Sequence, residues 1–276
     1  MDAPTPADRK AAIAAVFDRS SATYDQVGVD YFSAFGRRLV ERAGVRPGEH
    51  VLDVGSGRGA VTFAAADAVG PSGSVVGIDL APGMVERASE DARSRGLAHV
   101  SFRVGDAESP DVTGTFDAVL AGLVVFFLPD PMLALRNYRA LLRPGGRLGL
   151  TTFPPQPDGA WANVGKALQR YLPGMKQTAR PDEGPLSSPE ALAAALEEVG
   201  FASSATEVEP FDTEFRDADQ WWSWAWSHGQ RAALERVPAG EVEDVRAECV
   251  ELLRPETRPD GSITLRQYIA YTVATV

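Results

Sequence analysis

A glycine-rich run between two carboxylates is the part of this sequence whose chemistry is most specific. The run Gly55-Ser56-Gly57-Arg58-Gly59-Ala60 matches the pattern G-x-G-x-x-[GA]. Its glycines allow the backbone to approach a ligand closely at a strand-to-helix turn. Asp53 lies two residues before the run and Asp79 ends the next apolar segment, where a carboxylate can accept hydrogen bonds from both hydroxyls of a ribose. Both aspartates have the alternative of a helix-cap or loop role, but their placement at strand ends beside glycines favours a ligand site.

A third polar position follows the next apolar segment. In Gly105-Asp106-Ala107, the side chain of Asp106 and the backbone N–H of Ala107 have the right chemistry to bind an adenine edge. Gly-Asp is also common in turns, so a purely structural role for Asp106 stays open.

The elements that must position these residues are short apolar strands alternating with helices. This alternation predicts βαβ units and a parallel sheet covered on both faces. A helix from 131 to 142 should end at Arg143-Pro144-Gly145-Gly146, because proline and glycine terminate helices. The expected strands are 51–54, 74–79, 99–104, 116–121, 147–152, 202–211 and 263–276, and further helices are expected at 7–17, 30–43 and 188–199.

Four of these segments together resemble a known family. Residues 51–59, 76–79, 105–107 and 142–146 look like the ordered motifs of class I S-adenosylmethionine-dependent methyltransferases. The resemblance is strongest to the ubiquinone/menaquinone-type and natural-product branches, and it covers roughly residues 20 to 152.

The resemblance implies an α/β fold with a Rossmann-like, seven-stranded, mostly parallel sheet and helical lid insertions after strands five and six. Such sheets bind ligands at the carboxyl ends of their strands. We expect N-terminal helices closing over the cofactor in 1–45, the cofactor-binding core in 46–153, lid insertions in 154–187 and 212–260, and the remaining helix and strands of the core in 188–211 and 261–276.

The resemblance also implies S-adenosylmethionine as the cofactor and gives each motif a role. The loop with Gly55, Ser56 and Gly57 would hold the methionyl part, and Asp53 would orient its ammonium group. Asp79 would bind the ribose. The remaining cofactor-binding positions would be Leu80 and Met84 flanking the adenine, Asp106 and Ala107 at its edge, and the carbonyl of Ala121 beside the methionyl amine.

Candidates for catalysis are few. Tyr24 resembles a tyrosine that closes over the cofactor in this branch, although it would equally serve to anchor the first helix. Many relatives carry a histidine pair where this chain has Phe126-Phe127, and phenylalanine cannot accept a proton. We expect Phe126 to line the substrate pocket and Phe127 to be a core residue. Of the three histidines, His228 is the best candidate base, although a lone lid histidine is more often a hydrogen-bonded surface group.

Four tryptophans crowd the segment from 221 to 226. On a helix, Trp222 and Trp226 would share one face, and Trp221 and Trp224 another. Packing of the lid against the core and an aromatic-walled substrate pocket are both compatible with this cluster. We assign Trp222 and Trp226 to the pocket.

Composition limits the partners. The formal net charge of -11 argues against nucleic acid and against an anionic membrane surface. The single cysteine, Cys249, excludes an internal disulfide and a zinc-binding cysteine cluster. Because the start lacks the features of a signal peptide, we expect a cytoplasmic protein that binds a small molecule and no metal. A homo-oligomer is compatible with the sequence.

The function expected is methyl transfer to a small, largely apolar acceptor, a secondary metabolite methylated on carbon or oxygen of an isoprenoid or aromatic group. A strong base is optional when the acceptor ionises readily, and aromatic faces can stabilise the carbocation left on a methylated alkene. Two alternatives remain: a cyclase or binding protein that holds S-adenosylmethionine without transferring methyl, and an NAD-dependent oxidoreductase sharing the first glycine loop.

Overall fold

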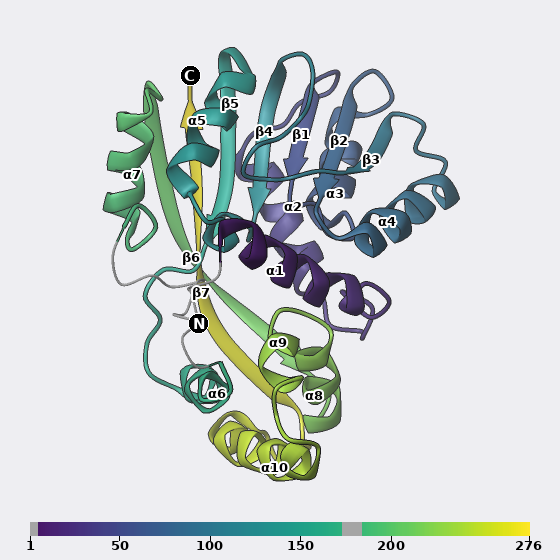
Figure 1. The fold of residues 1–276 in the computed structure, drawn as a ribbon, viewed down its shortest axis with the longest axis vertical. Helices are drawn as coiled ribbons and strands as arrows, with labels where there is room; N and C mark the ends of the chain where they lie inside the picture. Colours follow the sequence, from purple (N-terminus) through teal and green to yellow (C-terminus); the bar gives the residue numbers. More distant parts are fainter. Residues whose placement is uncertain (1–4, 173–183) are drawn as a thin grey trace.

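A seven-stranded sheet forms the centre of the molecule in the computed structural model, which describes residues 5–172 and 184–276 (Figure 1). The strand order is β3-β2-β1-β4-β5-β7-β6. Strands β1 to β5 are parallel, whereas β7 pairs antiparallel with both β5 and β6. This confirms the predicted mostly parallel, Rossmann-like sheet. The strands are β1 (His50–Val54), β2 (Ser74–Asp79), β3 (Val100–Val104), β4 (Phe116–Gly122), β5 (Leu142–Thr152), β6 (Ser203–Phe215) and β7 (Ile263–Thr275).

Helices cover both faces of the sheet. Leu39 of α2 and Ala65 of α3 are buried on one face, and Leu135 of α5 and Leu196 of α7 on the other. Since successive side chains of a strand point to opposite faces, Asp53 lies on the face that α3 covers. The helices are α1 (Pro6–Ser20), α2 (Phe32–Arg42), α3 (Ala60–Val69), α4 (Pro82–Ser94), α5 (Pro131–Leu141), α6 (Ala160–Gln169), α7 (Pro189–Glu198), α8 (Ala218–Trp226), α9 (Arg231–Leu234) and α10 (Val242–Leu253), with short 3-10 turns η1 (Val125–Phe127), η2 (Ala239–Glu241) and η3 (Arg254–Glu256).

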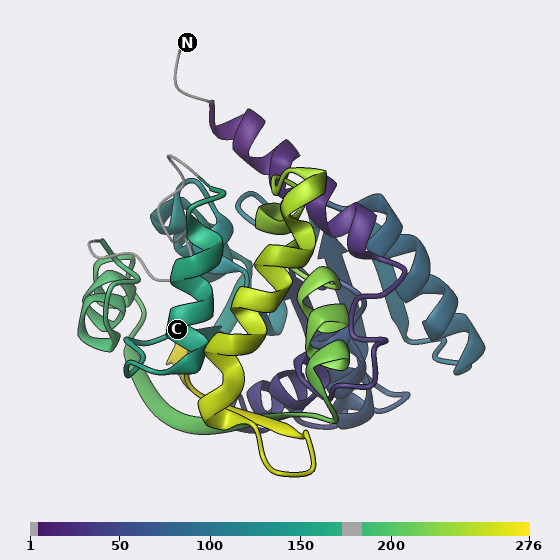
Figure 2. The same cartoon turned by 90° about the horizontal axis from the view of Figure 1, so that it is seen from below.

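Strand β6 reaches further than the sequence suggested, whereas β7 occupies the expected residues almost unchanged. Strand β6 continues to Phe215, which pairs with Ile263 of β7, so four residues assigned to an insertion beginning at 212 are strand. The reason is visible in the burial, because Thr213 and Phe215 face inward while Glu214 between them is exposed. The outer end of this hairpin carries α8, α9 and α10, with α6 beside them (Figures 1 and 2). Within the expected insertion 154–187, residues 173–183 lie outside the described residues.

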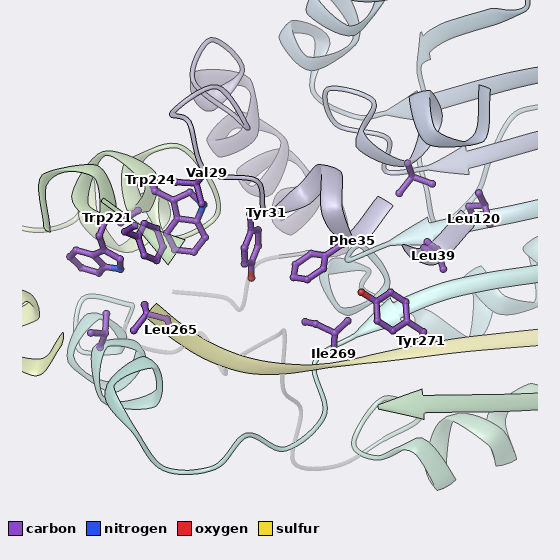
Figure 3. Packing of buried hydrophobic residues seen from close by; sticks show 14 of the residues in the cluster. Val29, Tyr31, Phe35, Leu39, Leu120, Trp221, Trp224, Leu265, Ile269 and Tyr271 are labelled. Atoms are coloured by element: carbon purple, nitrogen blue, oxygen red, sulfur yellow. The ribbon is translucent and has the colours of Figure 1, made fainter. Parts of the chain in front are cut away.

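One apolar cluster joins these outer helices to the sheet. Tyr31 has its ring centroid 5.0 Å from that of Trp224 and 4.6 Å from that of Phe35. Figure 3 shows Tyr31 and Phe35 between the tryptophans of α8 and Leu39 on the sheet side. The outer helices and the parallel sheet therefore share one core.

Trp224, one of two fully buried tryptophans on α8, should contribute strongly to this shared core. Trp224→Ala should lower the free energy of unfolding by about 3–5 kcal/mol, because truncating a buried aromatic ring removes its contacts and leaves a cavity. Urea unfolding followed by circular dichroism measures this loss. Trp222→Ala on the same helix is the matched control, since Trp222 is only partly buried and should lose less than half as much. Equal losses would contradict the assignment of Trp224 to the core.

Candidate cofactor and acceptor site

The turn from β1 into α3 requires its glycines. Gly55, Gly57 and Gly59 have φ values of 68°, 52° and 89°, in the left-handed region that side chains disfavour. A Cβ on Gly55 would lie 2.4 Å from the side chain of Val124, and a Cβ on Gly57 would face the ring of Tyr24 at 3.7 Å. The glycines thus keep open a space beneath Tyr24.

Three N–H groups of this turn are already bonded within the protein. Ser56 donates to the carbonyl of Ile78 at 2.9 Å, and Gly59 donates to the carbonyl of Ser56 at 2.8 Å. Gly57 donates to Oδ2 of Asp79 at 2.8 Å. A dinucleotide-binding loop instead presents free N–H groups to a pyrophosphate. The arrangement therefore argues against the nicotinamide alternative.

Two carboxylates border the same turn, of which Asp53 is fully buried and Asp79 half-buried. Asp79 accepts a second hydrogen bond from the N–H of Ala81 at 2.8 Å, and burial raises its pKa. Asp53 is fully buried behind the turn, where Thr62 donates its hydroxyl to Oδ2 at 2.5 Å. Oδ1 of Asp53 and the hydroxyl of Ser56 have no hydrogen-bond partner among the described residues. These unpaired acceptors and acidic groups fit a ligand that carries an ammonium group and hydroxyls, as S-adenosylmethionine does.

Burial without a cation raises the pKa of Asp53 to about 7. The folded chain therefore binds a proton at Asp53 more tightly than the unfolded chain does, and stability is lost as pH rises from about 4 through 7.

A small cavity of about 90 Å³ lies between the glycine turn and α1. It brings together seven of the predicted cofactor-binding residues. The other four lie outside its lining: Asp53 and Ser56 are buried behind the turn, Ala121 is buried in β4, and Asp106 binds Lys10. The seven lining residues are Tyr24, Gly55, Gly57, Asp79, Leu80, Met84 and Ala107.

Helix α1 closes this cavity. Nζ of Lys10 lies 2.7 Å from Oδ2 of Asp106 and 2.6 Å from Oε1 of Glu108, and the N–H of Gly83 donates to Asp18 at 2.7 Å. Ligand pockets usually measure roughly 300–1,000 Å³, so the space left beneath α1 is small for a molecule the size of the cofactor. No local pattern in the sequence pointed to Lys10, because its partners lie almost a hundred residues away in the chain.

A second cavity of about 710 Å³ opens beside the first, among α1, α6 and the link between α8 and α9. Phe126 lines it, as expected, together with Phe153 and Trp161, which the sequence analysis did not single out. Trp222 and Trp226 share a helix face, with ring centroids 6.2 Å apart, but neither lines this cavity. Their assignment to the pocket is corrected: α8 buries its other face, and these two rings pack half-exposed at the edge of the core.

The two cavities share a wall of five residues. Tyr24 stacks on Phe32 with ring centroids 4.3 Å apart, and Leu123 has a left-handed φ of 55°, which is rare for a bulky residue. Phe127, expected in the core, lines both cavities. The shared residues are Ile13, Phe17, Tyr24, Leu123 and Phe127.

Neither candidate base in the larger cavity is suited to accept a proton. Burial lowers the pKa of His228 to about 3, so its imidazole is neutral and weakly basic. Burial raises the pKa of Tyr24 well above its ordinary value, so its phenol stays protonated. The structure brings both residues to the cavity without making either a strong base.

Across the described part of the chain, no group of three or more histidine, cysteine, aspartate or glutamate side chains is arranged to hold a metal ion, and no helix there is long and apolar enough to span a membrane.

Asp53→Asn should separate stability from cofactor binding. At pH 8 the variant should be more stable than the wild type by roughly 2–4 kcal/mol, and at pH 4 about equally stable, because it removes a buried charge. Affinity for S-adenosylhomocysteine should fall, since the amide cannot pair with the ammonium group. Thermal unfolding between pH 4 and 8 and calorimetry measure the two effects.

Asp67→Asn on the exposed side of α3 is the control, with an expected change within about 0.5 kcal/mol. An Asp53→Asn protein with the same pH dependence of stability as the wild type would contradict the buried, unpaired carboxylate.

Lys10→Met should loosen α1 over the small cavity. Association of S-adenosylhomocysteine should become several-fold faster, equivalent to roughly 0.5–1.5 kcal/mol for the lost charged hydrogen bonds. Stopped-flow fluorescence measures this rate. Arg37→Met on α2 removes an exposed ion pair with Asp30 and should leave the association rate unchanged. An unchanged rate in Lys10→Met would show that α1 does not limit entry.

Comparison with known proteins identifies the family. A family model described as a methyltransferase domain matches residues 46–181. Nocamycin O-methyltransferase of Saccharothrix syringae is 38% identical over 268 residues, which cover 93% of this chain and 95% of that protein. Aklanonic acid methyltransferase DauC of Streptomyces sp. strain C5 is 44% identical over 172 residues, covering 59% and 78%. The solved structure of YcgJ from Bacillus subtilis matches with a TM-score of 0.59 at 20% identity, covering 88% and 97%. On these similarities, the chain belongs to the class I S-adenosylmethionine-dependent methyltransferases of natural-product type.

Proposed function

We propose that this enzyme methylates an oxygen atom of a mostly apolar small molecule whose hydroxyl ionises without help from a protein base. The observation that carries the proposal is the wall shared by the two cavities. A cofactor held at the glycine turn and an acceptor held in the larger cavity would meet at Tyr24, Leu123 and Phe127.

The chemistry supplied by bound S-adenosylmethionine is a methyl group already activated on a sulfonium. The protein then has to align the acceptor with this group and exclude water. Tyr24 is suited to alignment because its ring stacks on Phe32 and lies across from Gly57. Phe17 and Phe127, with ring centroids 5.5 Å apart, extend the dry wall beside it.

The absence of a strong base sets a condition on the acceptor. Among the described lining residues, the raised pKa of Tyr24 keeps its phenol protonated, and the lowered pKa of His228 leaves its imidazole a weak base. The side chain of Asp158 is almost fully exposed to solvent beside Lys166. An acceptor hydroxyl must therefore ionise by itself near neutral pH, as an enol, an acidic phenol or a carboxyl group does. The similarity to a methyltransferase named for aklanonic acid supports an acidic acceptor.

The size and lining of the larger cavity support a bulky, apolar molecule. About 710 Å³ is ample for several fused rings, and Phe126, Phe153 and Trp161 offer aromatic surface. Such faces would also stabilise the cation of a carbon methylation on an isoprenoid. The similarity to nocamycin O-methyltransferase over nearly the whole chain favours oxygen.

The test compares three compounds of similar size. 2-Hydroxy-1,4-naphthoquinone has an enolic hydroxyl that is ionised at pH 7, 2-naphthol is largely un-ionised there, and 2-methyl-1,4-naphthoquinone has no hydroxyl. With S-adenosylmethionine present, the first should gain an O-methyl group and release S-adenosylhomocysteine, measured by mass spectrometry. 2-Naphthol should react only as pH rises toward its own pKa, and the third should not react. Carbon methylation, or equal rates for the first two at pH 7, would refute the proposal.

Tyr24 provides a matched pair of variants in the same assay. Tyr24→Phe should keep kcat within a few-fold and leave its pH dependence unchanged, because the ring and not the hydroxyl is needed. Tyr24→Ala should lower kcat by at least tenfold through lost alignment. A loss of 10²-fold or more in Tyr24→Phe would instead indicate a role in proton transfer.

A further inference from the structure

Two residues that line the larger cavity each carry a buried polar atom with no hydrogen-bond partner among the described residues. These atoms are Nε2 of His228 and Oε1 of Gln230. His228 is only 9% exposed. Buried polar groups are nearly always paired, so unpaired ones beside a cavity indicate a ligand that completes them.

The local bonding of His228 favours Nε2 as the nitrogen that carries the proton. Nδ1 accepts the backbone N–H of Gln230 at 3.5 Å. A neutral imidazole that accepts at Nδ1 carries its hydrogen at Nε2, so Nε2 is a donor. The ring is held in place by Trp224, with centroids 4.0 Å apart, and by Tyr31, which stacks at 6.5 Å.

Gln230 presents the complementary group. It follows His228 by two residues in the link between α8 and α9, and its amide oxygen accepts hydrogen bonds but cannot donate them. One short segment therefore offers one donor and one acceptor to a cavity whose other described walls are mostly aromatic and aliphatic.

We propose that His228 and Gln230 form the polar recognition pair for the acceptor. His228 donates from Nε2 to a carbonyl oxygen of the bound molecule, and Gln230 accepts from one of its hydroxyl groups. The acceptor class is thus an apolar ring system that bears both a ketone-type oxygen and a hydroxyl. This proposal rests on the proposed function, since it concerns the same cavity, but it assigns His228 to specificity instead of proton transfer.

The pair would act mainly by rejection. A hydrocarbon placed against His228 and Gln230 leaves both groups buried and unpaired, which costs more than a formed hydrogen bond gains. Molecules of equal shape would thus be sorted by their oxygen atoms, while the aromatic walls bind all of them.

Three naphthalenes separate the two groups, with binding measured by calorimetry in the presence of S-adenosylhomocysteine. The wild type should bind 2-acetylnaphthalene and 2-naphthol each about three- to tenfold more tightly than 2-ethylnaphthalene, the range expected for one hydrogen bond. His228→Phe should abolish the preference for the acetyl compound, and His228→Gln, which keeps an N–H donor, should retain part of it. Gln230→Leu should abolish the preference for 2-naphthol and leave the preference for the acetyl compound intact.

Unchanged affinity for S-adenosylhomocysteine checks that each variant is folded, and Gln230→Leu alone still tests the pair if His228→Phe does not fold. Equal binding of all three compounds by the wild type would overturn the recognition pair, because bound water or the protein itself would then satisfy the two groups. Failure of the wild type to bind any of them would instead overturn the proposed function, because the cavity would not hold an apolar acceptor.

Discussion

The hydrogen bond from the N–H of Gly57 to the carboxylate of Asp79 is the interaction on which the site depends. It joins the end of β2 to the turn that follows β1, and so fixes a backbone that three left-handed glycines would otherwise leave free. The fixed turn sets the floor of the small cavity, opposite Tyr24. The same hydrogen bond uses the N–H group of Gly57, which a phosphate would otherwise need. The glycine pattern is therefore compatible with a cationic ligand and unfavourable for a dinucleotide.

The position of the outer helices follows from the length of one hairpin. Strands β6 and β7 pair along 13 residues each, and carry α8 to α10 beyond the parallel sheet. Tyr31 and Trp224 connect these helices to the same apolar cluster as the sheet, so the outer wall of the larger cavity is part of the core. The closing element is α1, whose contacts to the core include the ion pairs of Lys10. Helix α1 thus takes part in both cavities, since Ile13 and Phe17 also line the larger one.

The sequence predicted what depends on local pattern. The glycines, Asp79 and Met84 line the cofactor cavity because strand ends and their following turns lie together in a parallel sheet. The tryptophan faces were also predictable, since 3.6 residues per turn determines which rings share a side. Which face of α8 would be buried was not predictable, because it depends on where the hairpin of β6 and β7 places that helix. Trp161 of α6 therefore lines the cavity where Trp222 and Trp226 were expected. Lys10, Phe127 and Gln230 had no local signal, since each acquires its role from segments distant in the chain.

A common principle connects the cofactor turn and the acceptor cavity. Each keeps buried polar atoms unpaired: Oδ1 of Asp53 behind the turn, and Nε2 of His228 and Oε1 of Gln230 on residues that line the cavity. Such atoms destabilise the folded chain, in keeping with the raised pKa of the buried Asp53 carboxyl, and a bound molecule that pairs with them removes this cost. A ligand that supplies the missing hydrogen-bond partner recovers this free energy when it binds, whereas a ligand without that group does not. The unpaired atoms therefore discriminate between ligands at a cost to the stability of the free protein. A methyltransferase whose donor is already activated needs little from its protein by way of acid–base chemistry, and its polar residues are then free to select which molecule is brought to the methyl group.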